Sequence, residues 1–116
     1  MRNYSEADVK FYITQVVVAL GELHNKKIVH RDLKAENVCI GDNGYIKLID
    51  FGLASQRTIN LKSFVGTPEY QAPEILAGQT YNNMVDWWTV GILAYEMFTG
   101  KSPFVDVNDD KIYRRI

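Results

Sequence analysis

The chain is poor in cysteine and in proline, and it has almost no excess of charge of either sign. Its 116 residues contain one cysteine, Cys39, three prolines and a formal net charge of −1 at pH 7. A single cysteine cannot form an internal disulfide, which agrees with a reducing compartment. A net charge this small gives no reason to expect nucleic acid as a partner. We therefore expect an intracellular, cytoplasmic protein that binds no nucleic acid.

Long apolar runs are also missing. The longest unbroken run, residues 16–20, is far shorter than the roughly 20 residues that a membrane-spanning helix needs. Hydrophobic residues make up 47% of the chain and charged residues 23%, a composition typical of globular proteins rather than disordered ones. The sequence thus predicts one small globular domain without a membrane segment.

Two helices are predicted from capping and periodicity. Ser5–Asp8 fits a capping box, and the apolar residues after it recur on one helical face as far as about Lys27. A second helix is expected from about Asn83 to Thr99, ended by Gly100, and a short helical turn is expected to start at Pro73. The apolar face of the first helix consists of Val9, Tyr12, Ile13, Val16, Leu20 and Leu23.

A small β-hairpin is predicted between these helices. Two short β-branched runs, 38–40 and 45–49, flank Gly41–Gly44, whose Asn-Gly pair favours a hairpin turn. Residues 54–72 have no sustained period and many turn formers, which predicts an exposed loop. The expected fold class is mainly α with a small β-hairpin.

The expected hairpin register would bring polar side chains to one face. If Ile40 faces Tyr45, then Asn37 lies opposite Leu48, with Asp50 diagonally across at about 7–8 Å. A carboxylate and an amide oxygen suit Mg²⁺, which takes further oxygens from phosphates. The register therefore predicts a metal–phosphate site.

Two further residues extend this predicted site. Asp32, which precedes the hairpin, could accept a proton from an attacking hydroxyl. Lys34 could neutralise the charge that develops during phosphate transfer. Asp32, Asn37 or Asp50 alone could simply be a turn residue that caps a strand end, but all three together at this spacing favour phosphoryl-transfer chemistry.

Four blocks in this order resemble the C-terminal lobe of a eukaryotic-type protein kinase, within the AGC serine/threonine group. They are His30-Arg31-Asp32 with Asn37, Asp50-Phe51-Gly52, the block GTPEYQAPE at 66–74, and Asp86-Trp87-Trp88 with Gly91. The resemblance implies that residues 1–116 are a partial catalytic domain of the protein kinase-like fold. It would run from the helix before the catalytic loop to just after the second strong helix, without the N-terminal lobe or the last helices of the C-terminal lobe.

The resemblance also implies site roles and the cofactors ATP and Mg²⁺. Asp32 would be the catalytic base, Lys34 would contact the γ-phosphate, and Thr67 would bond both of them. Asn37 and Asp50 would hold the metal ions. The residues expected around the nucleotide are Lys34, Glu36, Asn37, Cys39 and Asp50.

Regulation and substrate choice are implied in the same way. Ser63 would be phosphorylated by an upstream activating kinase, and Arg31 would pair with that phosphate. Glu36, Glu69 and Glu96 would bind basic residues near the target Ser or Thr of a protein substrate. The simpler alternatives are that Ser63 is never modified and that the three acids are solvated surface residues.

Several residues have structural interpretations. His30 is expected to support the ring of Phe51. Asp86 could cap the second helix, and the resemblance implies that it bonds the catalytic-loop backbone. Cys39 stands where the family usually has leucine beneath the adenine ring; alternatively it is a small buried hydrophobe. His24 is expected to pack or to hydrogen-bond.

Two functions therefore compete. The first is a segment of a serine/threonine protein kinase that transfers the γ-phosphate of ATP to protein Ser or Thr when part of a complete kinase domain. The second is a catalytically inactive, truncated kinase-like interaction module, favoured by apolar positions on the second helix. Because the sequence contains no glycine-rich phosphate loop and no strand lysine, we expect the 116 residues alone to be inactive.

Overall fold

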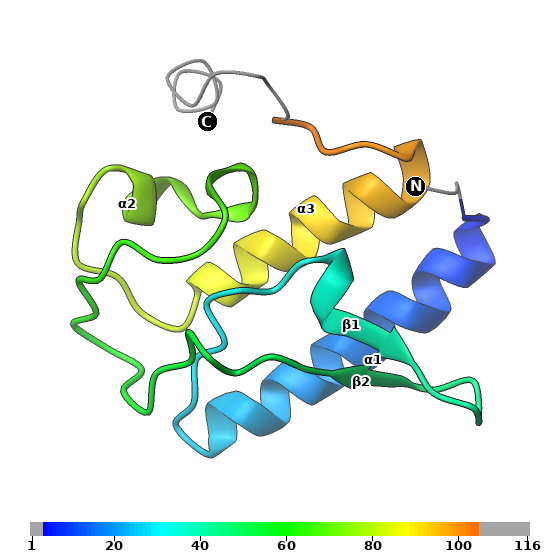
Figure 1. Ribbon diagram of the computed structural model, residues 1–116, viewed down its shortest axis with the longest axis horizontal. Coiled ribbons are helices and arrows are strands. Elements are labelled where there is room, and N and C mark those ends of the chain that lie inside the picture. The colour runs from blue at the N-terminus through cyan, green and yellow to red at the C-terminus, as the bar shows by residue number, and fades with distance from the viewer. Residues whose placement is uncertain (1–3, 105–116) are drawn as a thin grey trace.

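A computed structural model of the chain describes residues 4–104. Two long helices, α1 (Glu6–Asn25) and α3 (Val85–Thr99), pack against each other. A two-stranded antiparallel hairpin lies along α1, and the remaining chain forms loops with short helical turns (Figure 1). The expected class, mainly α with a small β-hairpin, is confirmed.

The start of α1 follows from its capping box. Ser5 Oγ accepts a hydrogen bond from the Asp8 N–H at 3.1 Å, and an Asp8 carboxylate oxygen accepts one from the Ser5 N–H at 3.2 Å. These bonds satisfy two backbone donors that a helix start would leave unpaired. The helix ends two residues before the predicted Lys27, which has a left-handed φ of 63°.

The first core cluster lies between α1 and α3. Every residue of the predicted apolar face of α1 is buried or half-buried, and burial of such side chains contributes roughly 1.5–3 kcal/mol each. At its far end α3 stops at Gly100, whose φ of 83° gives the left-handed cap predicted there. The buried members of this cluster are Val9, Val16, Leu20, Leu33, Val90, Leu93 and Met97.

A second cluster joins the long loop to α2 (Pro73–Leu76) and to the start of α3. The prediction that residues 54–72 form an exposed loop is wrong for part of the segment, because Leu61 and Tyr70 are buried. Leu61 exchanges both backbone hydrogen bonds with Tyr81 at 2.9 Å, which ties the loop to the core. A 3-10 turn, η2 (Pro68–Tyr70), follows in the same segment.

The hairpin forms where predicted but in a different register. β1 (Val38–Ile40) pairs with β2 (Ile46–Leu48), and Ile40 faces Ile46. The expected pairing of Ile40 with Tyr45 is therefore wrong by one residue.

The turn explains this difference. Gly44 has a left-handed φ of 83° and donates its N–H to the Gly41 carbonyl at 2.9 Å, while the Gly41 N–H donates to the Tyr45 carbonyl at 2.7 Å. The loop thus has three residues, and a left-handed glycine closes it. Asn37 now bonds Ile49 across the hairpin, at 2.9 Å, so the single polar face expected from the pleat does not form.

Candidate active site

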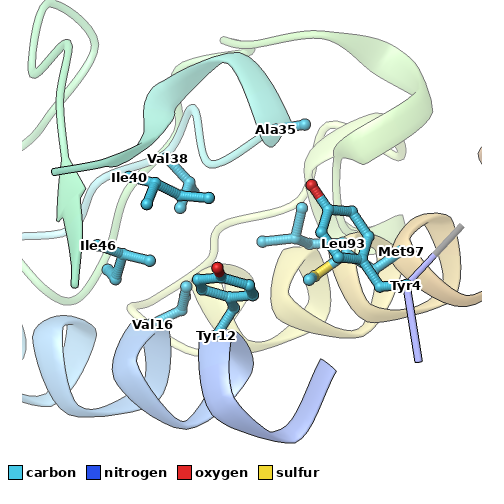
Figure 2. A pocket seen from close by; sticks show the side chains of 9 residues that line it. All are labelled: Tyr4, Tyr12, Val16, Ala35, Val38, Ile40, Ile46, Leu93 and Met97. Carbon is cyan, nitrogen blue, oxygen red and sulfur yellow. The ribbon is translucent and has the colours of Figure 1, made fainter. Parts of the chain in front are cut away.

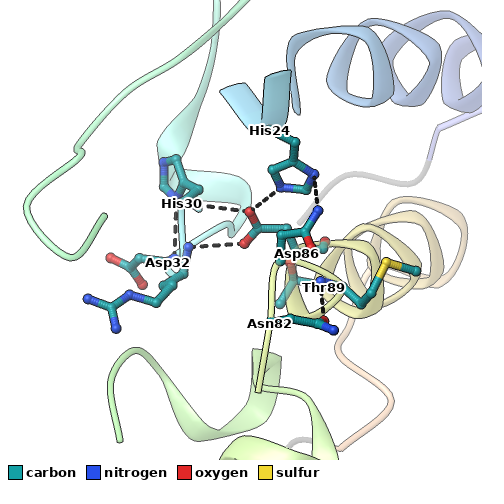
Figure 3. A network of polar contacts seen from close by, with 9 residues as sticks. His24, His30, Asp32, Asn82, Asp86 and Thr89 are labelled. Carbon is teal, nitrogen blue, oxygen red and sulfur yellow. Dashed lines mark hydrogen bonds and ion pairs between the residues drawn. The ribbon is translucent and has the colours of Figure 1, made fainter. Parts of the chain in front are cut away.

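The loop that carries His30, Arg31 and Asp32, which is the predicted catalytic loop, is anchored to α3 by one buried carboxylate. Asp86 is fully buried, and its Oδ2 and Oδ1 accept hydrogen bonds from the backbone N–H groups of His30 and Arg31, at 2.9 and 3.0 Å (Figure 3). His24 Nε2 lies 2.9 Å from the same Oδ2. The predicted link to the loop backbone is confirmed. The predicted helix cap is wrong, since α3 begins without a side-chain cap and the Asp86 carboxylate bonds the loop instead.

His30 supports the loop through both of its ring nitrogens. Its Nδ1 accepts the Asp32 N–H at 3.2 Å, so the proton is on Nε2, which donates to the Ile49 carbonyl at 3.0 Å. Both ring nitrogens are therefore used. The ring centre lies 5.1 Å from that of Phe51, as expected for a supporting histidine.

The three predicted catalytic side chains lie together. Asp32 is buried, and Lys34 Nζ lies 3.8 Å from its Oδ1. The same ammonium donates to Thr67 Oγ1 at 3.2 Å, although Thr67 comes from a different loop. A carboxylate, an ammonium and a hydroxyl group thus lie next to one another, and these are groups that can accept a proton and stabilise charge.

The predicted metal ligands are Asn37 and Asp50. Asn37 is buried and donates its amide N–H groups to Asp32, at 2.7 Å to the carbonyl and 3.3 Å to Oδ2, which leaves its amide oxygen for an ion. Asp50 is exposed, has a left-handed φ of 59°, and accepts the Gly52 N–H at 3.3 Å. Within residues 4–104, no group of three or more His, Cys, Asp or Glu side chains could hold a metal. An amide oxygen and a carboxylate nevertheless fit Mg²⁺ that completes its shell with water and phosphate.

Cys39 is exposed and lies opposite Lys47, so the interpretation as a buried hydrophobe is wrong. Its neighbours Val38 and Ile40 line an apolar pocket above α1 (Figure 2). Because side chains alternate along a strand, Cys39 points to the opposite face of the hairpin. The pocket contains none of the predicted catalytic residues.

Arg31 is connected to Ser63 through a tyrosine. Its Nε donates to the Leu53 carbonyl at 2.8 Å, and its Nη1 donates to the Tyr81 hydroxyl at 3.1 Å. That hydroxyl donates to the Ser63 carbonyl at 2.6 Å. Ser63 itself is exposed. Nothing in the sequence around Tyr81 distinguishes it from an ordinary core aromatic.

The three predicted substrate-binding acids differ in exposure. Glu36 is exposed, Glu69 is half-buried, and Glu96 is buried, where it accepts a hydrogen bond from the Tyr70 hydroxyl. Burial, and then the bond to Glu96, raise the pKa of Tyr70 well above its usual range. Burial also raises the pKa of the Glu69 carboxyl, as do the charges of Glu96 and Glu36, whereas Lys34 lowers it. Glu69 therefore shares one electrostatic environment with Glu36, Glu96 and Lys34.

Gln71 is a further contact to the catalytic loop that the sequence did not indicate. This buried side chain donates its amide N–H to the Arg31 carbonyl at 2.9 Å. Gly66 lies against it with a φ of 90°, and a Cβ added at Gly66 would be 1.6 Å from Gln71 Nε2. The segment 66–71 is thus fitted closely to the loop that carries Asp32.

An Asp and a Lys on a loop that is anchored to a helix, with a Thr from a second loop beside them, form the arrangement expected of a protein kinase. The family described as "Protein kinase domain" matches residues 1–116, and the chain belongs to it. The relatives described here are AGC-family kinases, so the chain belongs to the AGC-like group. It is 49% identical over 110 residues to "Serine/threonine-protein kinase gad8" of Schizosaccharomyces pombe, a match that covers 92% of this chain and 19% of that protein.

Two other relatives agree with this placement. The identity is 47% over 120 residues with "Serine/threonine-protein kinase YPK2/YKR2" of Saccharomyces cerevisiae, covering 98% of this chain and 17% of that protein. The identity is 44% over 114 residues with "cAMP-dependent protein kinase catalytic subunit PRKX" of Mus musculus, covering 98% of this chain and 32% of that protein. The chain thus spans at most about a third of these relatives. Among residues 4–104, no helix has the length and apolar character needed to cross a bilayer.

Proposed function

We propose that the protein containing this chain is a serine/threonine protein kinase that transfers the γ-phosphate of ATP to protein substrates. The observation that carries the proposal is the cluster of Asp32, Lys34 and Thr67, with Lys34 Nζ 3.8 Å from Asp32 and 3.2 Å from Thr67. Asp32 accepts the proton of the attacking hydroxyl. Lys34 stabilises charge on the transferred phosphoryl group. Mg²⁺ held by Asn37 and Asp50 would neutralise the ATP phosphates.

The proposed substrates carry basic residues near the target Ser or Thr. Support comes from Glu36, Glu69 and Glu96, whose charges act on one another. Burial and then the charges of Glu96 and Glu36 raise the pKa of Glu69, and a guanidinium placed among these acids would offset the repulsion between them. Arginine suits such a site because its planar group can pair with two carboxylate oxygens.

Nucleotide contact and regulation complete the proposal. Lys34, Glu36 and Cys39 are proposed to lie around ATP, with Cys39 under the adenine ring. An upstream activating kinase is proposed to phosphorylate exposed Ser63, and Arg31 to pair with that phosphate. The free, exposed thiol of Cys39 is consistent with the intracellular, cytoplasmic location that we propose.

A transfer assay on the full-length protein tests the main proposal. With ATP, Mg²⁺ and peptides that contain Arg or Ala upstream of a Ser, we expect a higher kcat/KM for the Arg peptide. Replacing Asp32 by Asn should lower kcat by about 10²–10⁴-fold. The matched control is Asp42→Asn, which changes an exposed loop carboxylate and should leave kcat unchanged.

The alternative, an inactive interaction module, rests on exposed apolar side chains, namely Met84 at the N-cap of α3 and Tyr95 and Phe98 on the helix itself. Absence of phosphoryl transfer by the full-length protein would favour this module and contradict the kinase proposal. Equal activity on Arg and Ala peptides would remove only the basic preference. The intact catalytic cluster favours the enzyme.

A further inference from the structure

Tyr81 occupies a position between the proposed phosphorylation site and the catalytic loop. Its side chain is buried, at 5% exposure. Its hydroxyl accepts from Arg31 Nη1 at 3.1 Å and donates to the Ser63 carbonyl at 2.6 Å. The direction of both bonds is fixed, because a guanidinium can only donate and a carbonyl can only accept. One hydroxyl therefore joins the two segments.

Both partners of this hydroxyl are themselves held in place. The backbone of Tyr81 exchanges two hydrogen bonds with Leu61, both 2.9 Å long, so the segment leading to Ser63 is held at a second point. Arg31 is held by its N–H to Asp86 and by its Nε to the Leu53 carbonyl. Its φ of 67° is left-handed, a conformation that costs energy for a non-glycine residue and needs such contacts.

We propose that Tyr81 is a positioning residue that couples the state of Ser63 to the catalytic loop, an inference that rests on the proposed phosphorylation of Ser63. An activating kinase would transfer the γ-phosphoryl group of ATP to Ser63 Oγ, which loses its proton, and would release ADP. Tyr81 keeps the Arg31 guanidinium next to the Ser63 backbone, so that the new phosphate meets an ordered partner. Because the Arg31 side chain is already ordered, less conformational entropy is lost when it pairs with the phosphate on Ser63. Arg31 precedes Asp32 directly, so the pairing acts on the catalytic base.

The test compares two states of the full-length protein, one with Ser63 phosphorylated, as verified by mass spectrometry, and one after phosphatase treatment. We expect the wild-type kcat to fall at least about tenfold on dephosphorylation, as the loss of a charge-assisted contact implies. In Tyr81→Phe, which removes only the hydroxyl, we expect the fall to be less than about threefold, with the KM for ATP unchanged. Tyr95→Phe, at an exposed tyrosine of α3, is the matched control and should keep the wild-type ratio.

Each outcome decides the inference. A Tyr81→Phe protein that keeps the wild-type ratio overturns it. A wild-type protein that is active but insensitive to Ser63 phosphorylation also overturns it, and leaves the kinase function standing. A wild-type protein inactive in both states overturns the proposed function itself. If Tyr81→Phe does not fold, Arg31→Lys decides, because it keeps the charge but loses the planar group that reaches Tyr81; a normal ratio in that variant would overturn the coupling.

Discussion

Replacing Asp86 by Asn tests whether one buried carboxylate holds the catalytic loop. In the wild type its two oxygens serve three groups: the N–H of His30, the N–H of Arg31 and the imidazole of His24, all within 3.0 Å. Asparagine has one acceptor oxygen and one NH₂ group. If that oxygen takes the place of Oδ2, it keeps two of the bonds, and the NH₂ group then faces the Arg31 N–H, donor against donor.

The expected loss is large compared with the stability of a small domain. One hydrogen bond to a charged acceptor, about 1.5–3 kcal/mol, disappears, and the other two weaken because the acceptor is neutral. Together these terms suggest a destabilisation of about 3–5 kcal/mol, similar to breaking a buried ionic contact. A domain of this kind has only about 5–15 kcal/mol in total.

Urea unfolding followed by tryptophan fluorescence measures this loss. Trp87 is a suitable probe, because its ring lies 5.3 Å from that of His24. Asp42→Asn makes the same chemical change on an exposed loop and should alter the free energy of unfolding by less than about 0.5 kcal/mol. A loss below about 1 kcal/mol in Asp86→Asn would refute the anchoring role.

Three further predictions concern the site in the full-length protein. Lys34→Ala should lower kcat by about 10²-fold or more, because it removes charge stabilisation in the transition state; a rise in KM with unchanged kcat would contradict this. ATP should protect Cys39 from alkylation by a maleimide, measured by mass spectrometry, and equal labelling with and without ATP would place Cys39 outside the nucleotide site. The KM for an Arg-containing peptide should fall as pH rises through the range above 4.5, because the pKa of Glu69 is raised and the ionised form of its carboxyl group, not the protonated one, attracts the cation. Glu69→Gln should abolish this dependence. A wild-type KM that does not change with pH would contradict the prediction.

Local signals in the sequence were sufficient for the helices and for part of the site. The capping box at Ser5 and the left-handed cap at Gly100 each depend on a few neighbouring residues. The start of α1 and the end of α3 could therefore be predicted closely. The hairpin register could not, because a three-residue and a four-residue loop both fit the same glycines. This difference of one residue in the loop decided which side chains share a face of the hairpin.

Contacts between distant segments were the least predictable part of the site. The proximity of Lys34 to Thr67 was reached only through family resemblance. Tyr81 and Gln71 were missed, because their roles depend on side chains brought from elsewhere in the chain. A tyrosine or a glutamine in a loop has no local pattern that identifies its partner.

The bonds from Asp86 to the catalytic loop also have a consequence for how the chain folds. They join residues 56 and 55 positions apart in the sequence, and closing so long a loop is entropically costly. We therefore expect the catalytic loop to take its final shape late, after α1 and α3 have met, because such distant contacts form slowly. In pulse-labelled refolding, the N–H groups of His30 and Arg31 should gain protection from exchange no earlier than the amides of α3; earlier protection would contradict this order. During synthesis, His30 and Arg31 would leave the ribosome long before Asp86, the residue that holds their backbone in place.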